Sequence, residues 1–212
     1  TGCSTTLVQQ LPAGDVTTCD PAWPGLWKAT SSAADKPEFA WVEVAADCKT
    51  LTFTDAEKTS VEHKTLSLVS TVAGDFLAIT DADGKLDCLG KDPKDCGFPI
   101  ERYVREGEQV RLYAANHRAV HEAIAAGEIT GLTQIGNKDD KEAAKPDAAT
   151  KPKPRQSAGT RAELTYQNLI TGSPEQIAQW FVEHPGYFDA EPWLVLDREK
   201  TDTRPKHAEV KK

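Results

Sequence analysis

The sequence predicts a mainly β protein with two short helices, folded as an antiparallel barrel or a strongly curved sheet. Its short runs have the alternation and composition of β-strands. These runs are 27–30, 39–45, 51–54, 61–72, 76–80, 100–105, 110–114, 129–134, 164–170 and 193–196. Hairpin signals separate several neighbouring runs, at 73–75, 83–84 and 106–108. Because such turns join consecutive strands, we expect antiparallel pairing between neighbours in the chain.

Two helices are expected, at 117–126 and 174–184. Asn116 can accept a hydrogen bond from a free N–H at the start of the first helix, and Gly127 suits the left-handed position after its end. Ser173 and Gln176 have the spacing of a capping box at the start of the second helix. Local signals therefore define both helices.

The chain of 212 residues is expected to contain a tether, one folded domain and a tail. Residues 1–24 predict an N-terminal tether, because prolines and glycine prevent long helices there. Residues 25–197 predict a single β-rich domain. Within it, 137–160 has many charges, three prolines and no large apolar side chain, which predicts a mobile insertion; a linker between two domains is the alternative. Residues 198–212 predict a charged, disordered tail.

Composition excludes some classes of function and favours others. The net charge of −8 argues against nucleic-acid binding, which needs a basic surface, and suits a basic protein partner. No run approaches the roughly 18 apolar residues of a membrane-spanning helix. Methionine is absent even from position 1, so we expect a processed chain from which a signal peptide has been removed.

Five cysteines divide into one and four. Cys88 and Cys96 flank a short loop with glycine and proline, which favours a local disulfide and leaves Cys19 to pair with Cys48. Four reduced cysteines or a zinc site are the alternatives, but the C-x2-C spacing of structural zinc sites is missing. Two disulfides would imply an oxidising compartment.

The odd cysteine, Cys3, lies in Thr1-Gly2-Cys3-Ser4. This segment resembles the end of a bacterial lipobox, in which small residues precede the cysteine that is lipidated. The resemblance implies that Cys3 carries a lipid and anchors the chain to a membrane. In that family, serine after the cysteine implies the outer membrane, so Ser4 predicts an outer-membrane lipoprotein facing the periplasm or the surface.

The segment Gly25-Leu26-Trp27 resembles the G-x-W motif at the first strand of lipocalins. The region from Tyr103 through the short helix ending at Gly127 to Ile129-Thr130-Gly131 is also similar to lipocalin-like bacterial lipoproteins. The resemblance implies a lipocalin-like barrel, and no binding residues are carried over from it. If the barrel is wide enough, its aromatic residues are candidates to line a ligand cavity. These are Trp23, Trp27, Trp41, Trp180 and Trp193.

Two groups of residues have the spacing of metal ligands. His117 and His121 lie four apart on the predicted helix, but they share a face with apolar residues and lack a third ligand. His184 suits a helix C-terminus. The segment 81–87 begins like a calcium loop, but its glycine and its twelfth position do not fit, so a β-turn explains it better. We therefore predict no metal and no cofactor.

No catalytic motif is evident, and we predict that the protein is not an enzyme. Thr171-Gly172-Ser173-Pro174 lacks the second glycine of a nucleophile elbow and serves as a helix cap. The leading hypothesis is a lipid-anchored cell-envelope lipoprotein that acts as a protein-binding or assembly module. A lipocalin-like carrier of an apolar small molecule is the first alternative. An inhibitor or immunity protein against a cell-wall hydrolase is the second.

Overall fold

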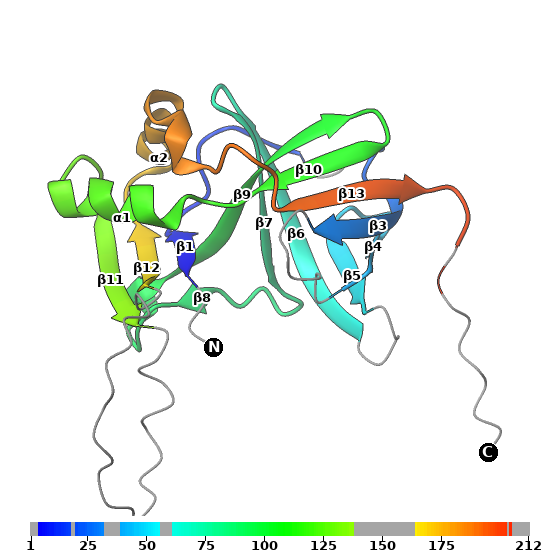
Figure 1. Ribbon diagram of the computed structural model, residues 1–212, viewed down its shortest axis with the longest axis horizontal. Helices are drawn as coiled ribbons and strands as arrows, with labels where there is room; N and C mark the ends of the chain where they lie inside the picture. The colour runs from blue at the N-terminus through cyan, green and yellow to red at the C-terminus, as the bar shows by residue number, and fades with distance from the viewer. Residues whose placement is uncertain are drawn as a thin grey trace, which may run out of the picture.

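An eight-stranded antiparallel barrel forms one part of the computed structural model, and a smaller sheet with two helices lies beside it (Figure 1). The structure describes residues 4–17, 20–31, 39–55, 61–137, 164–202 and 204. Cys3, Cys19 and the expected insertion from residue 138 onward lie outside these ranges. The predicted fold class, mainly β with an antiparallel barrel, is confirmed.

The barrel strands follow one another around the barrel in chain order. They are β3 (Gly25–Ser31), β4 (Trp41–Val44), β5 (Thr50–Thr54), β6 (Val61–Thr71), β7 (Gly74–Asp81), β9 (Cys96–Glu106), β10 (Gln109–Tyr113) and β13 (Leu194–Glu199). Strand β13 pairs with both β10 and β3, while β10 also pairs with β9, and these pairings close the barrel. Because every pair around the ring is antiparallel, this is an up-and-down barrel.

Alternate residues of each barrel strand point inward, as the pleat of a β-strand requires. On β6 the inward residues are Leu66 and Leu68, which are 4% and 3% exposed. On β7, Leu77 points inward, while its neighbour Phe76 points outward and is nevertheless buried. The barrel therefore has an apolar interior, and one part of its outer wall is also covered.

The second part of the structure, which we call the side layer, covers that outer wall. It consists of β1 (Thr5–Val8), α1 (His117–Ala126), β11 (Gly131–Asn137), β12 (Leu164–Ile170) and α2 (Pro174–Glu183). Strand β9 belongs to both parts, because its first half pairs with β1 and its second half with β7 and β10. Phe76 and Ile100 of the barrel pack against Phe181 and Phe188 in a second apolar core.

Both helices begin and end close to where the sequence predicts. Asn116 accepts a hydrogen bond from the backbone of Ala119, and Gly127 adopts φ +74° after α1. Ser173 and Gln176 form the predicted capping box at the start of α2. Neither helix is long and apolar enough to cross a membrane, and the same holds for every other helix in the described residues.

The expected tether over residues 1–24 differs from the structure. Strand β1 pairs in parallel with β12, and its Leu7 and Val8 are fully buried. Strand β2 (Asp15–Thr17) pairs with β6. The backbone N–H and C=O groups of Leu7 and Val8 are hydrogen-bonded within the sheet, whereas in a tether they would be hydrogen-bonded to water.

The segment 20–24 lies across the end of the barrel where β3 begins and β13 ends. Trp23 packs against Trp27 of β3 and Tyr103 of β9, with ring centroids 6.0 and 5.3 Å apart. The Trp27 indole N–H donates a hydrogen bond to the Trp23 carbonyl at 2.9 Å. Asp20 forms an ion pair with Arg105 at 3.3 Å. These contacts close this end of the barrel.

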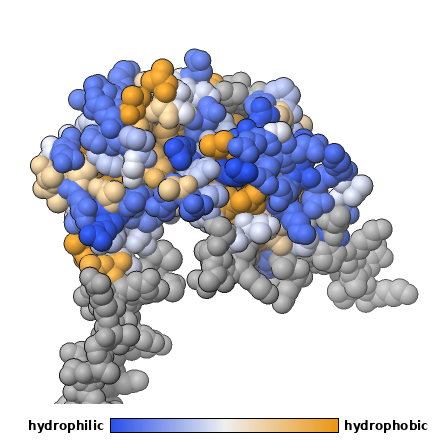
Figure 2. Space-filling view, turned by 45° about the horizontal axis from the view of Figure 1, so that its top comes forward, coloured by the Kyte–Doolittle hydropathy of each residue, from blue (hydrophilic) through white to orange (hydrophobic). Residues whose placement is uncertain are grey.

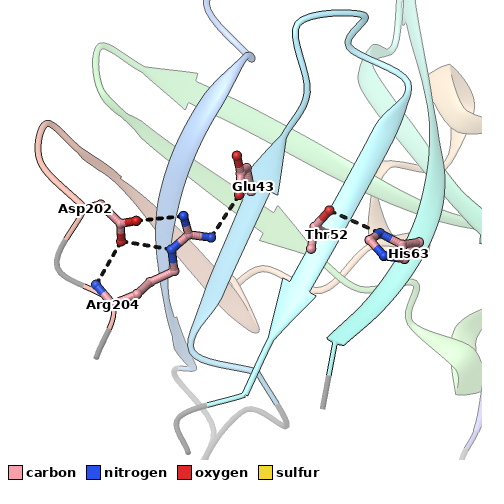
Figure 3. A network of polar contacts seen from close by, with 5 residues as sticks. All are labelled: Glu43, Thr52, His63, Asp202 and Arg204. Carbon is pink, nitrogen blue, oxygen red and sulfur yellow. Dashed lines mark hydrogen bonds and ion pairs between the residues drawn. The ribbon is translucent and has the colours of Figure 1, made fainter. Parts of the chain in front are cut away.

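The expected tail from residue 198 begins inside the fold. Arg198 lies in β13, and its guanidinium donates hydrogen bonds to the carbonyls of Ala22 and Pro24. Gly25 allows this approach, because it has φ +137° and a Cβ there would lie 3.1 Å from Arg198 Nη2. Further along, Arg204 pairs with Glu43 on the outer wall of the barrel at 2.8 Å (Figure 3). Arg198 and Arg204 are therefore both attached to the barrel.

Candidate ligand-binding cavity

An apolar cavity of about 100 Å³ lies inside the barrel. Its lining includes residues from every barrel strand except β3, together with Trp23, Phe39 and Trp193 outside the strands. The described lining residues are Trp23, Phe39, Val42, Leu51, Phe53, Leu66, Leu77, Ile79, Glu101, Leu112, Trp193, Leu194 and Leu196. Most are buried, whereas Phe39, Phe53, Ile79, Glu101 and Trp193 are partly buried as whole residues.

Glu101 is the one titratable residue in this described lining. It comes from β9, two residues before Tyr103, so the two side chains point inward together. Its Oε2 atom is sealed from solvent and has no hydrogen-bond partner among the described residues. A carboxyl in such surroundings is costly to keep charged.

Burial among apolar side chains raises the pKa of Glu101 from its ordinary 4.5 to about 7. The indole N–H of Trp193 opposes this rise by favouring the ionised form. Trp193 Nε1 is itself buried without a partner in hydrogen-bond geometry, so it lies near the carboxyl without satisfying it. Near neutral pH, Glu101 can therefore either accept or donate a hydrogen bond inside the cavity.

The size of the cavity limits what it can hold. A cavity of roughly 150 Å³ in another protein accommodates benzene, so this one suits a short chain, a small ring or one end of a larger molecule. The described lining offers apolar contact on most sides and polar groups at Glu101 and Trp193. This combination is typical of small-molecule sites, where a few polar groups orient an apolar ligand.

Two of the five tryptophans predicted as lining residues do line the cavity, namely Trp23 and Trp193. Trp27 belongs to the same core but lies at the closed end. Trp180 packs in the side layer on the other side of the barrel wall. Trp41 is not among the described lining residues.

The predicted Cys88–Cys96 disulfide is present, and it joins β8 (Asp87–Cys88) to the start of β9. Cys48 is also disulfide-bonded. Its Sγ lies 3.5 Å from the carbonyl oxygen of Asp20, the residue after Cys19. Cys19 and Cys3 lie outside the described residues, so the Cys19–Cys48 pairing and the lipidation of Cys3 stay predictions.

His117 and His121 face the sheet of the side layer, where Asn168 of β12 connects them through two threonines. Asn168 is fully buried and donates to the Thr6 hydroxyl at 3.1 Å and to the His117 carbonyl at 2.8 Å. The Thr6 hydroxyl lies 2.8 Å from His117 Nδ1. On the other side, the Thr133 hydroxyl donates to the Asn168 carbonyl oxygen and lies 2.6 Å from His121 Nδ1.

This network assigns a different role to each imidazole. Because Thr133 donates to Asn168, its oxygen accepts from His121 Nδ1–H. Thr6 accepts from Asn168, so its hydroxyl is free to donate to His117 Nδ1. Burial lowers the pKa of His117, which favours this neutral form. The two histidines thus attach α1 to the sheet.

The other candidate metal positions also have local roles. His184 ends α2 and stacks on Tyr187, with ring centroids 4.8 Å apart. The backbone carbonyl of Asp81 accepts a hydrogen bond from Gly84 N–H, which forms a turn at the end of β7. The Asp81 carboxylate pairs with Lys64 at 2.8 Å. Across the described ranges, no three histidine, cysteine or acidic residues are grouped as a metal site.

Among the described residues, exposed apolar side chains form small separate groups rather than one large patch, and the face in Figure 2 is mostly hydrophilic. Ile135 and Leu164 lie on one face of the paired strands β11 and β12 and Leu132 lies on the other face, each about half exposed. Val72 is 94% exposed after β6. Single exposed apolar residues are common on soluble domains and need no partner.

The sequence interpretation missed Glu101, although a signal was available. The run 100–105 alternates Ile100, Arg102 and Val104 with Glu101, Tyr103 and Arg105. In the structure Tyr103 points into the barrel, and the period of two then places Glu101 beside it. An acidic residue in register with an inward aromatic residue was therefore the available indication of a polar position in the cavity.

No protein-family model matches this chain, and neither curated protein sequences nor solved structures provide a match.

Proposed function

We propose that the barrel binds a small, mainly apolar molecule in the cavity beside Glu101. The observation that carries this proposal is the pair Glu101 Oε2 and Trp193 Nε1, which lie near each other in an otherwise apolar lining without reaching hydrogen-bond geometry. A buried polar group without a partner costs about 1–3 kcal/mol, and protein cores usually avoid it. A ligand that supplies the missing hydrogen bonds removes this cost and accounts for both groups.

A thermal-unfolding experiment on the full chain tests the proposal. We expect small apolar probes, such as toluene, cyclohexane and 1-pentanol, to raise the melting temperature, because a ligand that binds the folded state stabilises it. Leu112→Phe fills the cavity from β10 and should abolish this rise. Val72→Phe adds the same kind of bulk at an exposed position and should leave it unchanged.

Two outcomes would contradict cavity binding. The first is a melting temperature that no probe alters at any soluble concentration. The second is an equal response in wild type and Leu112→Phe, because the probes would then bind elsewhere. Trp23 and Trp193 line the cavity, so quenching of tryptophan fluorescence by the same probes gives an independent measurement.

The proposal includes a location in an oxidising compartment, with the chain held in a bacterial envelope through a lipid on Cys3. Its support is the Cys88–Cys96 disulfide together with the half-cystine Cys48, since such bonds persist mainly outside the cytosol. Mass spectrometry of the native protein from membranes tests the anchor. A Cys3 that carries no lipid would contradict it.

The protein-binding module and the hydrolase inhibitor stay predictions from the sequence. In the described part of the chain, exposed apolar residues are scattered in small groups, and charged side chains such as Arg204 and Lys64 pair within the chain. The cavity carries a more specific argument than these surfaces. Small-molecule binding is therefore the function that we put forward.

A further inference from the structure

We infer that the ligand carries a hydroxyl group, which lies between the Glu101 carboxyl and the Trp193 indole N–H while an apolar body fills the cavity. This inference rests on the proposed function and specifies the chemical class of the ligand. Its basis is the pairing of one unsatisfied acceptor, Glu101 Oε2, with one unsatisfied donor, Trp193 Nε1, in the same cavity lining. The Trp23 indole, also unpaired, lies beside Tyr103.

The two groups set a requirement that few ligand heads meet. The Trp193 indole N–H can only donate, so it needs an acceptor. The Glu101 oxygen needs a donor, whether the group is ionised or presents its carbonyl oxygen in the protonated form. A hydroxyl has one donor and two acceptor lone pairs. It can therefore satisfy both groups at once and needs no charge of its own.

Other ligand end groups can form a good hydrogen bond with at most one of the two residues. A hydrocarbon adds no hydrogen bond to either group and leaves them only their imperfect mutual contact. An ammonium ion can pair with ionised Glu101, but it has no lone pair for the Trp193 N–H and must itself be desolvated. A carboxylate can accept from Trp193, but it would place a second anionic group beside Glu101, which disfavours the ionised form of both. Glu101 and Trp193 thus favour a neutral end group that has both a hydrogen-bond donor and an acceptor.

The body of the ligand follows from the remaining lining. Leu77, Leu112 and Leu196 surround the cavity with aliphatic surface. The volume of about 100 Å³ admits a short alkyl chain or a small ring. We therefore identify the ligand class as a small aliphatic or aromatic alcohol, or a longer molecule that inserts such an end.

A matched series of four probes tests this inference: 1-pentanol, hexane, pentylamine and pentanoate. They share similar alkyl chains and differ mainly at the end group. Binding to the full chain is measured by tryptophan fluorescence, in wild type and in Glu101→Gln, Glu101→Leu and Trp193→Phe. Gln keeps an acceptor oxygen without a titratable group, whereas Leu and Phe each remove one of the two hydrogen-bonding groups.

We expect pentanol to bind more tightly than hexane in wild type and in Glu101→Gln. The ratio of the two affinities should fall about tenfold in Glu101→Leu and in Trp193→Phe, as expected for the loss of one hydrogen bond of about 1.4 kcal/mol. Pentanol affinity should also change little between pH 5.5 and 8.5, since the hydroxyl pairs with either form of Glu101.

Three results would overturn the hydroxyl assignment while leaving cavity binding intact. One is an unchanged pentanol-to-hexane ratio in both Glu101→Leu and Trp193→Phe. Another is tighter binding of pentylamine that rises with pH and disappears in Glu101→Gln, which would assign an ammonium ligand. The third is preferred binding of pentanoate. If none of the four probes binds, the proposed function itself fails, so the two failures can be told apart.

Discussion

The guanidinium of Arg198 lies over the indole of Trp27, with Cζ 4.9 Å from the ring centroid. One residue is near the end of the last barrel strand and the other is in the first. Arg198 also donates to the carbonyls of Ala22 and Pro24, which lead into the first strand. This contact therefore holds together the two strands whose pairing helps to close the barrel, and it fixes the segment that covers the closed end.

Replacing Arg198 should destabilise the fold. Arg198→Ala removes a cation–π contact and leaves two carbonyls without these donors, so we expect a loss of about 3 kcal/mol. Arg198→Lys should recover only part of it, because lysine lacks the planar fork that reaches both carbonyls. Urea unfolding of each variant measures the loss.

Lys200 provides the control for Arg198, because it is exposed and pairs with Glu108 at the surface. Lys200→Ala should cost less than about 1 kcal/mol. Equal losses for Lys200→Ala and Arg198→Ala would contradict the role assigned to Arg198.

Glu101 should give the fold a specific dependence on pH. Its pKa is about 7 in the folded protein and near its ordinary 4.5 when unfolded, so the folded state holds the proton more tightly. The contribution of Glu101 is fully present below pH 4.5 and is lost as pH rises to about 7, a change of about 3 kcal/mol. Glu101→Gln should remove this slope.

Chemical denaturation at pH 4.5, 6 and 7.5 measures the effect in wild type and Glu101→Gln. Glu128→Gln is the control, because Glu128 is exposed after α1, and its profile should follow wild type. Parallel profiles for wild type and Glu101→Gln would show that Glu101 is not buried as described.

Asn168 should be essential for the attachment of α1 to the side layer. Asn168→Ala removes the amide that joins Thr6, Thr133 and the His117 carbonyl. We expect a loss of about 2–4 kcal/mol, because the buried partners are left unpaired. Hydrogen exchange should accelerate more in α1 than in the barrel strands when Asn168 is replaced. Gln134→Ala, at an exposed position on β11, should show neither effect.

The same network predicts the state of its histidines. Nitrogen-15 spectra should show the proton of neutral His117 on Nε2 and a proton on Nδ1 of His121. The lowered pKa of His117 means that the folded state binds its proton less tightly. Its contribution is therefore present above the ordinary pKa of 6.5 and is lost as pH falls below it. Identical tautomers for the two rings would contradict the network.

Removing the Cys88–Cys96 disulfide should lower stability without altering the cavity. The bond closes a loop of sequence separation 8, so the chain-entropy estimate for its loss is about 2–3 kcal/mol. The double variant Cys88→Ser, Cys96→Ser should keep its affinity for cavity probes, because neither cysteine is a lining residue. A matching loss of probe binding would instead show that this loop supports the site.

Local signals predicted much of this fold. The caps at Asn116 and Ser173 act within a few residues of each helix, so both helices were placed nearly to the residue. The hairpin at Gly107 likewise joins β9 and β10 directly. Such interactions need no knowledge of the rest of the chain, and the barrel follows when several of them are repeated.

Contacts between distant segments left weaker signals. Leu7 and Val8 gain their partners from β12, far along the chain, and nothing near them indicates a strand of this kind. From the sequence, Arg198 was predicted to begin a charged tail, because its contact with the Trp27 ring is visible only in the folded structure. Glu101 similarly became a cavity residue only when the barrel closed around it. Each of these roles depends on partners that only the tertiary fold supplies.

The order of the barrel strands has a consequence for biosynthesis. The eighth strand, Leu194–Glu199, is translated after the whole side layer, yet it must pair with both β3 and β10. A nascent chain that stops before Leu194 therefore keeps two unpaired sheet edges, which favour aggregation. The barrel can therefore close only after Glu199 has been translated, so termination before Leu194 yields a product with an open sheet rather than a smaller barrel.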